Sequence, residues 1–102
     1  MNANVAPLVA AGVALIEAKR PGAVALLDPA VLRVDSSCDC PLGQTFGSYV
    51  KGKKALRLDE TGALQHGFTW PASGYAGTLS CDFIADLNAE WRRVIAARRA
   101  AL

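Results

Sequence analysis

Cys38 and Cys40 are the residues of this sequence with the clearest capacity for chemistry, and they stand in the stretch SSCDCPLGQTFGSY. Pro41 follows them directly. Proline suits the first position of a helix, because its missing amide hydrogen would have no partner there, and the residue before a proline is disfavoured in the helical conformation. We therefore expect Cys40 to cap a helix that begins at Pro41.

By residue type, the cysteines and the single histidine make a Cys3His zinc set, because thiolates and an imidazole suit a tetrahedral zinc site. The candidate ligands are Cys38, Cys40, His66 and Cys81. Structural zinc ligands usually come as cysteine pairs with about two to four residues between them. Here the only close pair is C-x-C, and the other two ligands stand far apart in the sequence. We therefore favour unliganded thiols and keep a zinc site as an alternative.

A reactive thiol is a further alternative, because a cysteine at a helix N-terminus can have a lowered pKa. Cys40 has that placement in the predicted helix. The neighbouring Asp39 is acidic, however, and a disulfide between Cys38 and Cys40 would close a small strained ring. The helix cap remains the favoured role for Cys40.

Other catalytic arrangements find little support in the sequence. His66 precedes Gly67, which we expect to end a helix, and a histidine near a helix C-terminus is a favourable charge placement in its own right. Asp82, Asp86 and Glu90 recur at i, i+4 and i+8 on what should be the solvent face of the last helix. We find no recognisable Ser-His-Asp triad, H-E-x-x-H motif or phosphate-binding glycine loop. We expect a protein that is not an enzyme and that needs no cofactor.

Basic residues gather in two clusters. The first contains Lys51, Lys53, Lys54 and Arg57, and the second contains Arg92, Arg93, Arg98 and Arg99. The formal net charge of the chain is only +2, which is too small to indicate a nucleic-acid or membrane partner. Both clusters fall near the ends of predicted helices, where the helix dipole favours cations. A phosphate-binding face is kept as an alternative, although no helix-turn-helix, zinc finger or aromatic stacking platform accompanies the clusters.

The elements that must position these residues are helices, because no stretch alternates between apolar and polar residues for long enough to indicate a strand. The predicted segments are a helix over 7–20, a short apolar piece over 23–27, one turn over 28–32, a helix over 41–56, a turn over 59–62, a short helix over 63–66, a loop over 71–77, and a last helix capped by Thr78 or Ser80. The prediction is an all-α fold, a compact bundle of four or five short helices in a single domain over residues 1–102.

The core must be small, because much of the apolar content of this 102-residue chain is alanine, which buries little area. The predicted core residues are Val9, Val13, Ile16, Leu26, Leu27, Leu42, Phe46, Leu56, Phe68, Phe83, Leu87, Trp91 and Ile95.

Glycines interrupt the interior of the helix predicted over 41–56. Each costs up to about 1 kcal/mol relative to alanine, so a helix that keeps several of them usually has a steric reason. Gly43 and Gly47 would lie on one face, as a close crossing of two helices requires. If the chain itself does not cover that face, a second subunit would do so.

The compartment is predicted from the cysteines and from the N-terminal run. The run over 5–16 is apolar, but it is too short to span a bilayer and lacks the preceding Lys or Arg of a signal peptide. Three cysteines are an odd number with no disulfide-framework spacing, so we expect free thiols, a reducing compartment and, by default, the cytoplasm. We expect no membrane partner.

The motif residues resemble those of a set of small uncharacterised proteins from actinobacteria and their phages. Those proteins combine a serine-rich turn and a cysteine with a helix of pattern Leu-Gly-Gln-x-aromatic-Gly-x-Tyr and a later His-Gly-Phe. The matching positions are Ser36, Ser37, Cys40, Leu42, Gly43, Gln44, Phe46, Gly47, Tyr49, Gly52, His66, Gly67 and Phe68, with Pro41 in place of an aliphatic residue. The resemblance covers roughly the middle third of the chain and implies a bacterial or phage context, with no activity attached.

Three hypotheses of function follow. The first is a small non-enzymatic interaction protein that binds another protein or a second copy of itself, with Gly43, Gly47 and the basic residues Lys51, Lys53, Lys54, Arg92 and Arg93 as candidate contact residues. The second is a nucleic-acid-associated factor that uses the two basic clusters. The third is a zinc or thiol site on the cysteines and the histidine.

Overall fold

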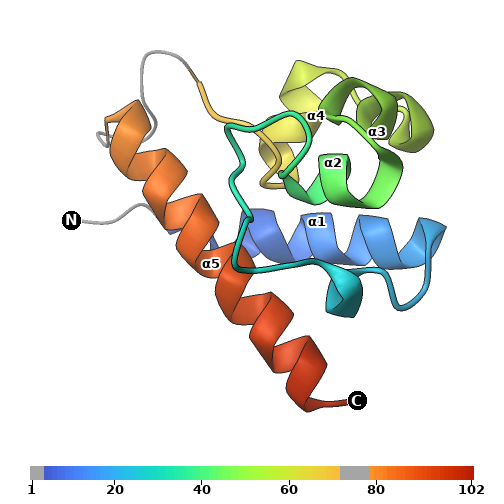
Figure 1. The fold of residues 1–102 in the computed structure, drawn as a ribbon. Coiled ribbons are helices and arrows are strands. Elements are labelled where there is room, and N and C mark those ends of the chain that lie inside the picture. Colours follow the sequence, from blue (N-terminus) through green and yellow to red (C-terminus); the bar gives the residue numbers. More distant parts are fainter. Residues whose placement is uncertain (1–3, 72–78) are drawn as a thin grey trace.

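The apolar N-terminal run forms helix α1 (Ala6–Lys19) in the computed structural model, which describes residues 4–71 and 79–102. Val9, Val13 and Ile16 are buried on one face of this helix, at the spacing that the sequence predicts. In Figure 1, α1 lies across the middle of the molecule, with α2, α3 and α4 on one side and α5 crossing it near its N-terminal end. It contacts α3, α4 and α5, so it is the element around which the others pack.

The segment after α1 is less helical than the sequence predicts. Val24–Leu26 forms one turn of 3-10 helix, and the expected helical turn over 28–32 is a plain turn. Asp28 shapes that turn, because its side chain accepts a hydrogen bond from the amide of Ala30 at 2.9 Å. Leu32 and Val34, which follow it, are buried.

The prediction of one helix over 41–56 is wrong. The segment makes two helices, α2 (Pro41–Phe46) and α3 (Tyr49–Leu56). Gly47 ends the first with a φ of 102°, a left-handed conformation that favours glycine. Ser48 begins the second, because its side chain accepts a hydrogen bond from the amide of Lys51 at 3.1 Å. Gly43 and Gly47 therefore do not share a helix face, and the predicted glycine crossing does not form.

The two remaining helices begin where local capping sets them. Helix α4 (Glu60–Gln65) starts earlier than predicted, because the Asp59 side chain accepts a hydrogen bond from the amide of Gly62 at 2.7 Å. Helix α5 (Ser80–Ala100) has Leu79 at its cap position, so Ser80 is its first residue and not its cap. Thr78 and most of the loop predicted over 71–77 lie outside the described residues.

The core is built where α5 crosses α1. Trp91 is fully buried, its ring stacks on Phe68 with centroids 5.7 Å apart, and its indole nitrogen donates to the carbonyl oxygen of Gly67 at 2.8 Å. The core prediction is confirmed at most positions, but Leu26 is 81% exposed, and Phe46 and Leu56 lie at the edge of the core. The buried residues that the prediction omitted are Val5, Val24, Ala25, Leu32, Val34, Cys40 and Ala63.

The fold class is confirmed: the chain is all-α, with five α-helices and no strand in the described parts. None of the described helices combines the length and the apolar character needed to cross a bilayer.

Candidate interaction surface

The four residues of the zinc alternative do not come together. Cys40 is buried, whereas Cys38 and Cys81 are exposed, the latter in the first turn of α5. The Nδ1 atom of His66 lies 2.7 Å from the carbonyl oxygen of Gly62, within its own helix end. Across residues 4–71 and 79–102, no three His, Cys, Asp or Glu side chains form a group that could hold a metal ion.

Cys40 caps helix α2, as the sequence predicts. Its sulfur accepts a hydrogen bond from the amide of Gly43 at 3.2 Å, and the thiol lies 3.7 Å from the carbonyl oxygen of Ser37. Burial raises the pKa of the Cys40 thiol, so the thiolate form is disfavoured. A reactive cysteine needs the opposite shift, and the geometry of Cys40 is that of a structural residue.

The rest of the motif around Cys40 joins two parts of the chain. The Gln44 side chain donates to the carbonyl oxygens of Asp28 and Asp39 at 3.2 and 2.9 Å, and accepts from the amide of Asp28 at 2.6 Å. The backbone of Gly43 lies against that of Ser37, since a Cβ built on Gly43 would stand 2.2 Å from the Ser37 carbonyl oxygen. Gly43 is therefore covered by its own chain. Cys40, Gly43 and Gln44 together hold the preceding segment against α2, and we call this set of contacts the clamp.

Two of the four arginines of the second basic cluster bond to backbone carbonyls of a distant segment. Arg92 donates to the carbonyl oxygens of Pro29 and Leu32 at 3.2 and 2.7 Å. Arg99 donates to those of Ala25 and Leu27 at 3.0 and 2.9 Å. These bonds attach the segment that follows α1 to the face of α5.

The other two arginines of that cluster pair with carboxylates. Arg93 makes two hydrogen bonds to Glu90, at 2.9 and 2.6 Å, and Arg98 bonds to Glu17 of α1 at 2.8 Å. The Arg93 guanidinium lowers the pKa of Glu90, so this pair is ionised at neutral pH. Two of the four positive charges that the sequence predicts near the end of α5 are thus compensated by carboxylates within the chain.

The first basic cluster is partly compensated as well. Lys53 pairs with Glu60, and its ammonium group lies 4.7 Å from the centre of the Tyr49 ring. Lys51 and Lys54 are exposed on α3, as is Arg57 just after it.

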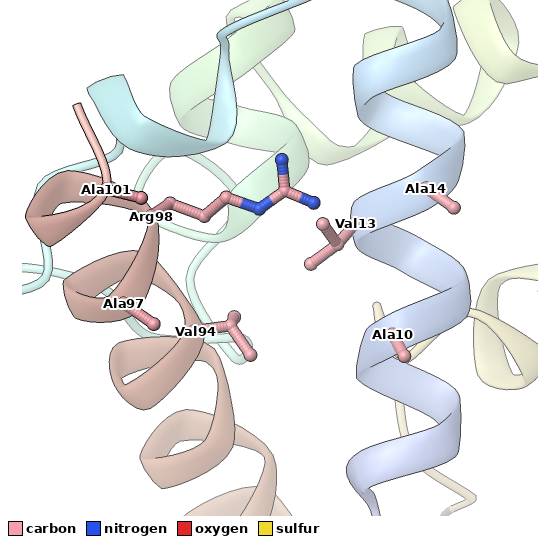
Figure 2. A pocket seen from close by; sticks show the side chains of 7 residues that line it. All are labelled: Ala10, Val13, Ala14, Val94, Ala97, Arg98 and Ala101. Carbon is pink, nitrogen blue, oxygen red and sulfur yellow. The ribbon is translucent and has the colours of Figure 1, made fainter.

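An apolar groove lies between α1 and α5 (Figure 2). It has a volume of about 420 Å³. Its lining consists of Ala10, Val13, Ala14, Val94, Ala97, Arg98 and Ala101. The only charged lining residue, Arg98, extends from α5 toward α1, where its bond to Glu17 closes one end of the groove.

The wall of the groove on the α1 side consists of the exposed Ala10 and Ala14 and the buried Val13. Ala6, Ala10 and Ala14 face solvent, and no polar or charged side chain occurs between Val5 and Ile16. Nearer the N-terminal end of α1, a separate hollow of about 290 Å³ lies between the same two helices, and the Glu90–Arg93 pair helps to line it. One ion pair, Glu17–Arg98, therefore stands at the groove itself, and a second stands at the neighbouring hollow.

Sequence reasoning did not identify this groove. One signal for it was available, because α1 is apolar on every side from Ala6 to Ile16, whereas a surface helix normally carries a polar face. The spacing of Val94, Ala97 and Ala101 beside the buried Trp91 was the matching signal on α5. Neither signal predicts that the two helices are neighbours in the fold.

No protein-family model matches this chain, and no curated protein or solved structure shows a significant similarity to it. The function of the groove is therefore argued from its own geometry and chemistry.

Proposed function

We propose that this chain is a small non-enzymatic interaction protein that binds an apolar helix in the groove between α1 and α5. The single observation that carries the proposal is the groove itself, an open apolar channel between two helices whose walls are made of alanine and valine apart from Arg98 at one end. Helix-in-groove binding of this kind places the apolar face of one helix against such a channel.

The size of the lining residues supports a helix as the bound element. Two packed helices lie about 8 to 10 Å apart, and the smallest side chains allow the closest approach. Ala10 and Ala14 on one wall and Ala97 on the other leave the backbone of a third helix room to approach both.

The exposed apolar face of α1 supports the same proposal. A helix that is apolar all round is usually buried on all sides, yet the stretch of α1 before Glu17 exposes Ala6, Pro7, Ala10 and Ala14. Binding of a partner helix would bury this face. The three free cysteines support a reducing compartment, and we place the protein in the cytoplasm.

The proposal favours a protein partner over nucleic acid. Arg92 and Arg99 use their guanidinium groups on backbone carbonyls, and Arg93 and Arg98 use theirs on carboxylates. Nucleic-acid affinity depends on cations that are available for phosphates.

Site-specific photo-crosslinking in cells that produce the chain tests the proposal. A benzoylphenylalanine residue placed at Ala97, inside the groove, should give an adduct with a protein upon irradiation. The matched control carries the same residue at Ala96, which is exposed but does not line the groove. The substitution Ala14→Glu on the opposite wall should abolish the adduct from position 97. Equal adducts from positions 96 and 97, or no adduct from either, would contradict the proposal.

A further inference from the structure

Resting on the proposed function, we infer that the helix bound in the groove is α5 of a second copy of this chain, and that a two-fold axis passes close to Val94. In this arrangement the two α5 helices lie antiparallel, and each occupies the groove of the other copy. The two-fold operation makes the interface isologous, with the same surface used on both copies.

The positions of the charged residues on α5 indicate this register. Glu90 precedes Val94 by four residues and Arg98 follows it by four, so both lie on the same face of α5, about 6 Å to either side of Val94 along the helix axis. An axis at Val94 therefore brings Glu90 of each copy level with Arg98 of the other. Opposite charges therefore meet at both ends of the interface.

The ion pairs already present in each chain fit the same arrangement. Glu17 and Arg98 stand at the groove, and Glu90 and Arg93 stand at the neighbouring hollow. The net charge of each ion pair is zero, so a partner helix with charges of a single sign would gain little electrostatic attraction at either pair. A second copy presents the same alternation in reverse order, which joins the four pairs of the dimer into two mixed networks.

The direction of the helices also favours an antiparallel second copy. The stretches of α1 and α5 that line the groove run in the same direction, as the order of Ala10 and Ala14 beside Val94, Ala97 and Ala101 in Figure 2 shows. Their dipoles therefore point the same way. A copy related by a two-fold axis across the groove places its α5 antiparallel to the first α5, which is the favourable orientation of these two dipoles.

The first measurement is the mass of the purified chain by sedimentation equilibrium from about 1 μM to 1 mM, a range that covers the affinities expected for a small interface. We expect a reversible monomer–dimer equilibrium. Ala97→Glu, which places a charge in the groove, should raise the dimer Kd by at least about tenfold. Ala96→Glu, outside the groove, should leave the Kd unchanged.

Disulfide trapping tests the register. In a chain with Cys38→Ser and Cys81→Ser, the buried Cys40 remains, and Val94→Cys places one thiol at the proposed axis. The thiols introduced at position 94 of the two copies should then form a disulfide-linked dimer upon mild oxidation. Ala101→Cys serves as the control, because position 101 is seven residues from the axis and would stand about 21 Å from its copy, beyond the reach of a disulfide.

Charge exchange provides a second test of the register. Glu90→Arg and Arg98→Glu should each weaken the dimer by about tenfold, and the double variant should restore its Kd, with thermal unfolding of the monomer recorded alongside. Ion pairs that act only within one chain would change the unfolding temperature without this reciprocal effect on dimerisation.

These experiments distinguish failure of the proposed dimer from failure of the proposed helix-binding groove. A chain that stays monomeric to 1 mM overturns the second copy as occupant, as does trapping at position 101 in place of 94. If the photo-crosslinked adduct at position 97 then contains a different protein, the groove remains the binding site and only its occupant is changed. If position 97 gives no photo-crosslinked adduct at all, both the proposed function and the proposed dimer are wrong.

Discussion

Arg92 and Leu32 are joined directly although 60 positions separate them in the chain: the guanidinium of Arg92 donates to the carbonyl oxygen of Leu32 at 2.7 Å. The same side chain donates to the carbonyl oxygen of Pro29 at 3.2 Å. The planar guanidinium presents several donors in a fixed geometry, so one side chain satisfies both carbonyls of this turn. Arg92 therefore fastens the turn to α5.

Substitution of Arg92 and of its neighbour Arg93 should separate this role from simple surface charge. Arg92→Ala leaves the partly buried carbonyl of Leu32 without its charged donor, and we expect a loss of about 1 to 3 kcal/mol in the free energy of unfolding. Arg93→Ala removes only an exposed pair with Glu90, which should cost less than about 1 kcal/mol. Urea denaturation followed by circular dichroism measures both. Equal losses for the two variants would show that the bonds of Arg92 add nothing specific.

A lysine at position 92 provides a further control. Arg92→Lys keeps the charge but offers one compact ammonium group in place of the guanidinium fork, so it cannot make the same two bonds. We expect it to recover less than half of the stability lost in Arg92→Ala. Full recovery would mean that charge alone accounts for the effect of Arg92.

Gly43 should be the least tolerant position of α2. In an open helix, a change from glycine to alanine stabilises by up to about 1 kcal/mol. At position 43, however, the new Cβ would lie 2.2 Å from the carbonyl oxygen of Ser37 and 2.6 Å from that of Cys38, and backbone atoms cannot rotate away as a side chain can. We therefore expect Gly43→Ala to destabilise the protein by about 1 to 3 kcal/mol in urea denaturation.

The matched control for Gly43 is Gly62→Ala in α4. There the nearest atoms belong to the side chains of Leu58 and Asp59, at 3.1 and 3.2 Å, which can move by a few tenths of an ångström. The change in stability should stay within about 1 kcal/mol of zero. If Gly43→Ala proves equally mild, the clamp formed around Cys40 and Gln44 is looser than the distances indicate.

Local rules predicted the helices and their caps more successfully than they predicted long-range contacts. Cys40 before Pro41 and the apolar spacing of α5 from Phe83 to Ile95 were sufficient to place those elements. The break at Gly47 was missed, because the apolar stripe continues from Leu42 through Tyr49 to Leu56. The pair Gly47–Ser48 was the available signal, since glycine commonly ends a helix and serine commonly begins one.

The candidate site shows why the remainder could not be predicted. Arg92, Arg98 and Arg99 form one positive cluster in the sequence, yet each bonds a group that lies more than 50 positions away. The groove likewise depends on the placement of α5 beside α1. Leu26 was predicted to be buried because it is apolar, but the 3-10 turn that contains it buries its neighbours Val24 and Ala25 instead.

The three thiols should differ sharply in reactivity. Cys38 and Cys81 are exposed, whereas Cys40 is 1% exposed and its pKa is raised by burial. Alkylation with iodoacetamide at neutral pH, followed by peptide mass spectrometry, should label the first two readily and label Cys40 only after unfolding. Rapid labelling of Cys40 in the folded protein would instead revive the reactive-thiol alternative.

The capping role of Cys40 can be tested by substitution. Cys40→Ser retains a side chain that accepts from the amide of Gly43, so it should change the stability little. Cys40→Ala removes the cap and should cost about 0.5 to 2 kcal/mol. The comparison is made by thermal or urea unfolding. A larger loss for serine than for alanine would show that the burial of the sulfur, and not the cap, dominates at this position.

Tyr49 should make the stability of the protein sensitive to alkaline pH. Burial, with a contribution from the Glu60 carboxylate, raises the pKa of Tyr49 to about 12, whereas an unfolded tyrosine ionises near pH 10. The folded state thus holds the phenolic proton more tightly, and the unfolded state binds fewer protons between these values. The resulting stabilisation is fully present below about pH 10 and is lost as the pH rises through about 12.

Urea unfolding at several pH values up to about 11.5 tests this dependence. The wild-type protein should lose stability more steeply above about pH 10 than Tyr49→Phe, which has no phenol at this position. Glu60→Gln removes the nearby negative charge, so the absorbance titration of Tyr49 should shift to lower pH. Since burial is the larger cause, that shift should be partial. A Tyr49 that titrates near pH 10 in the folded protein would contradict its partly buried placement at the start of α3.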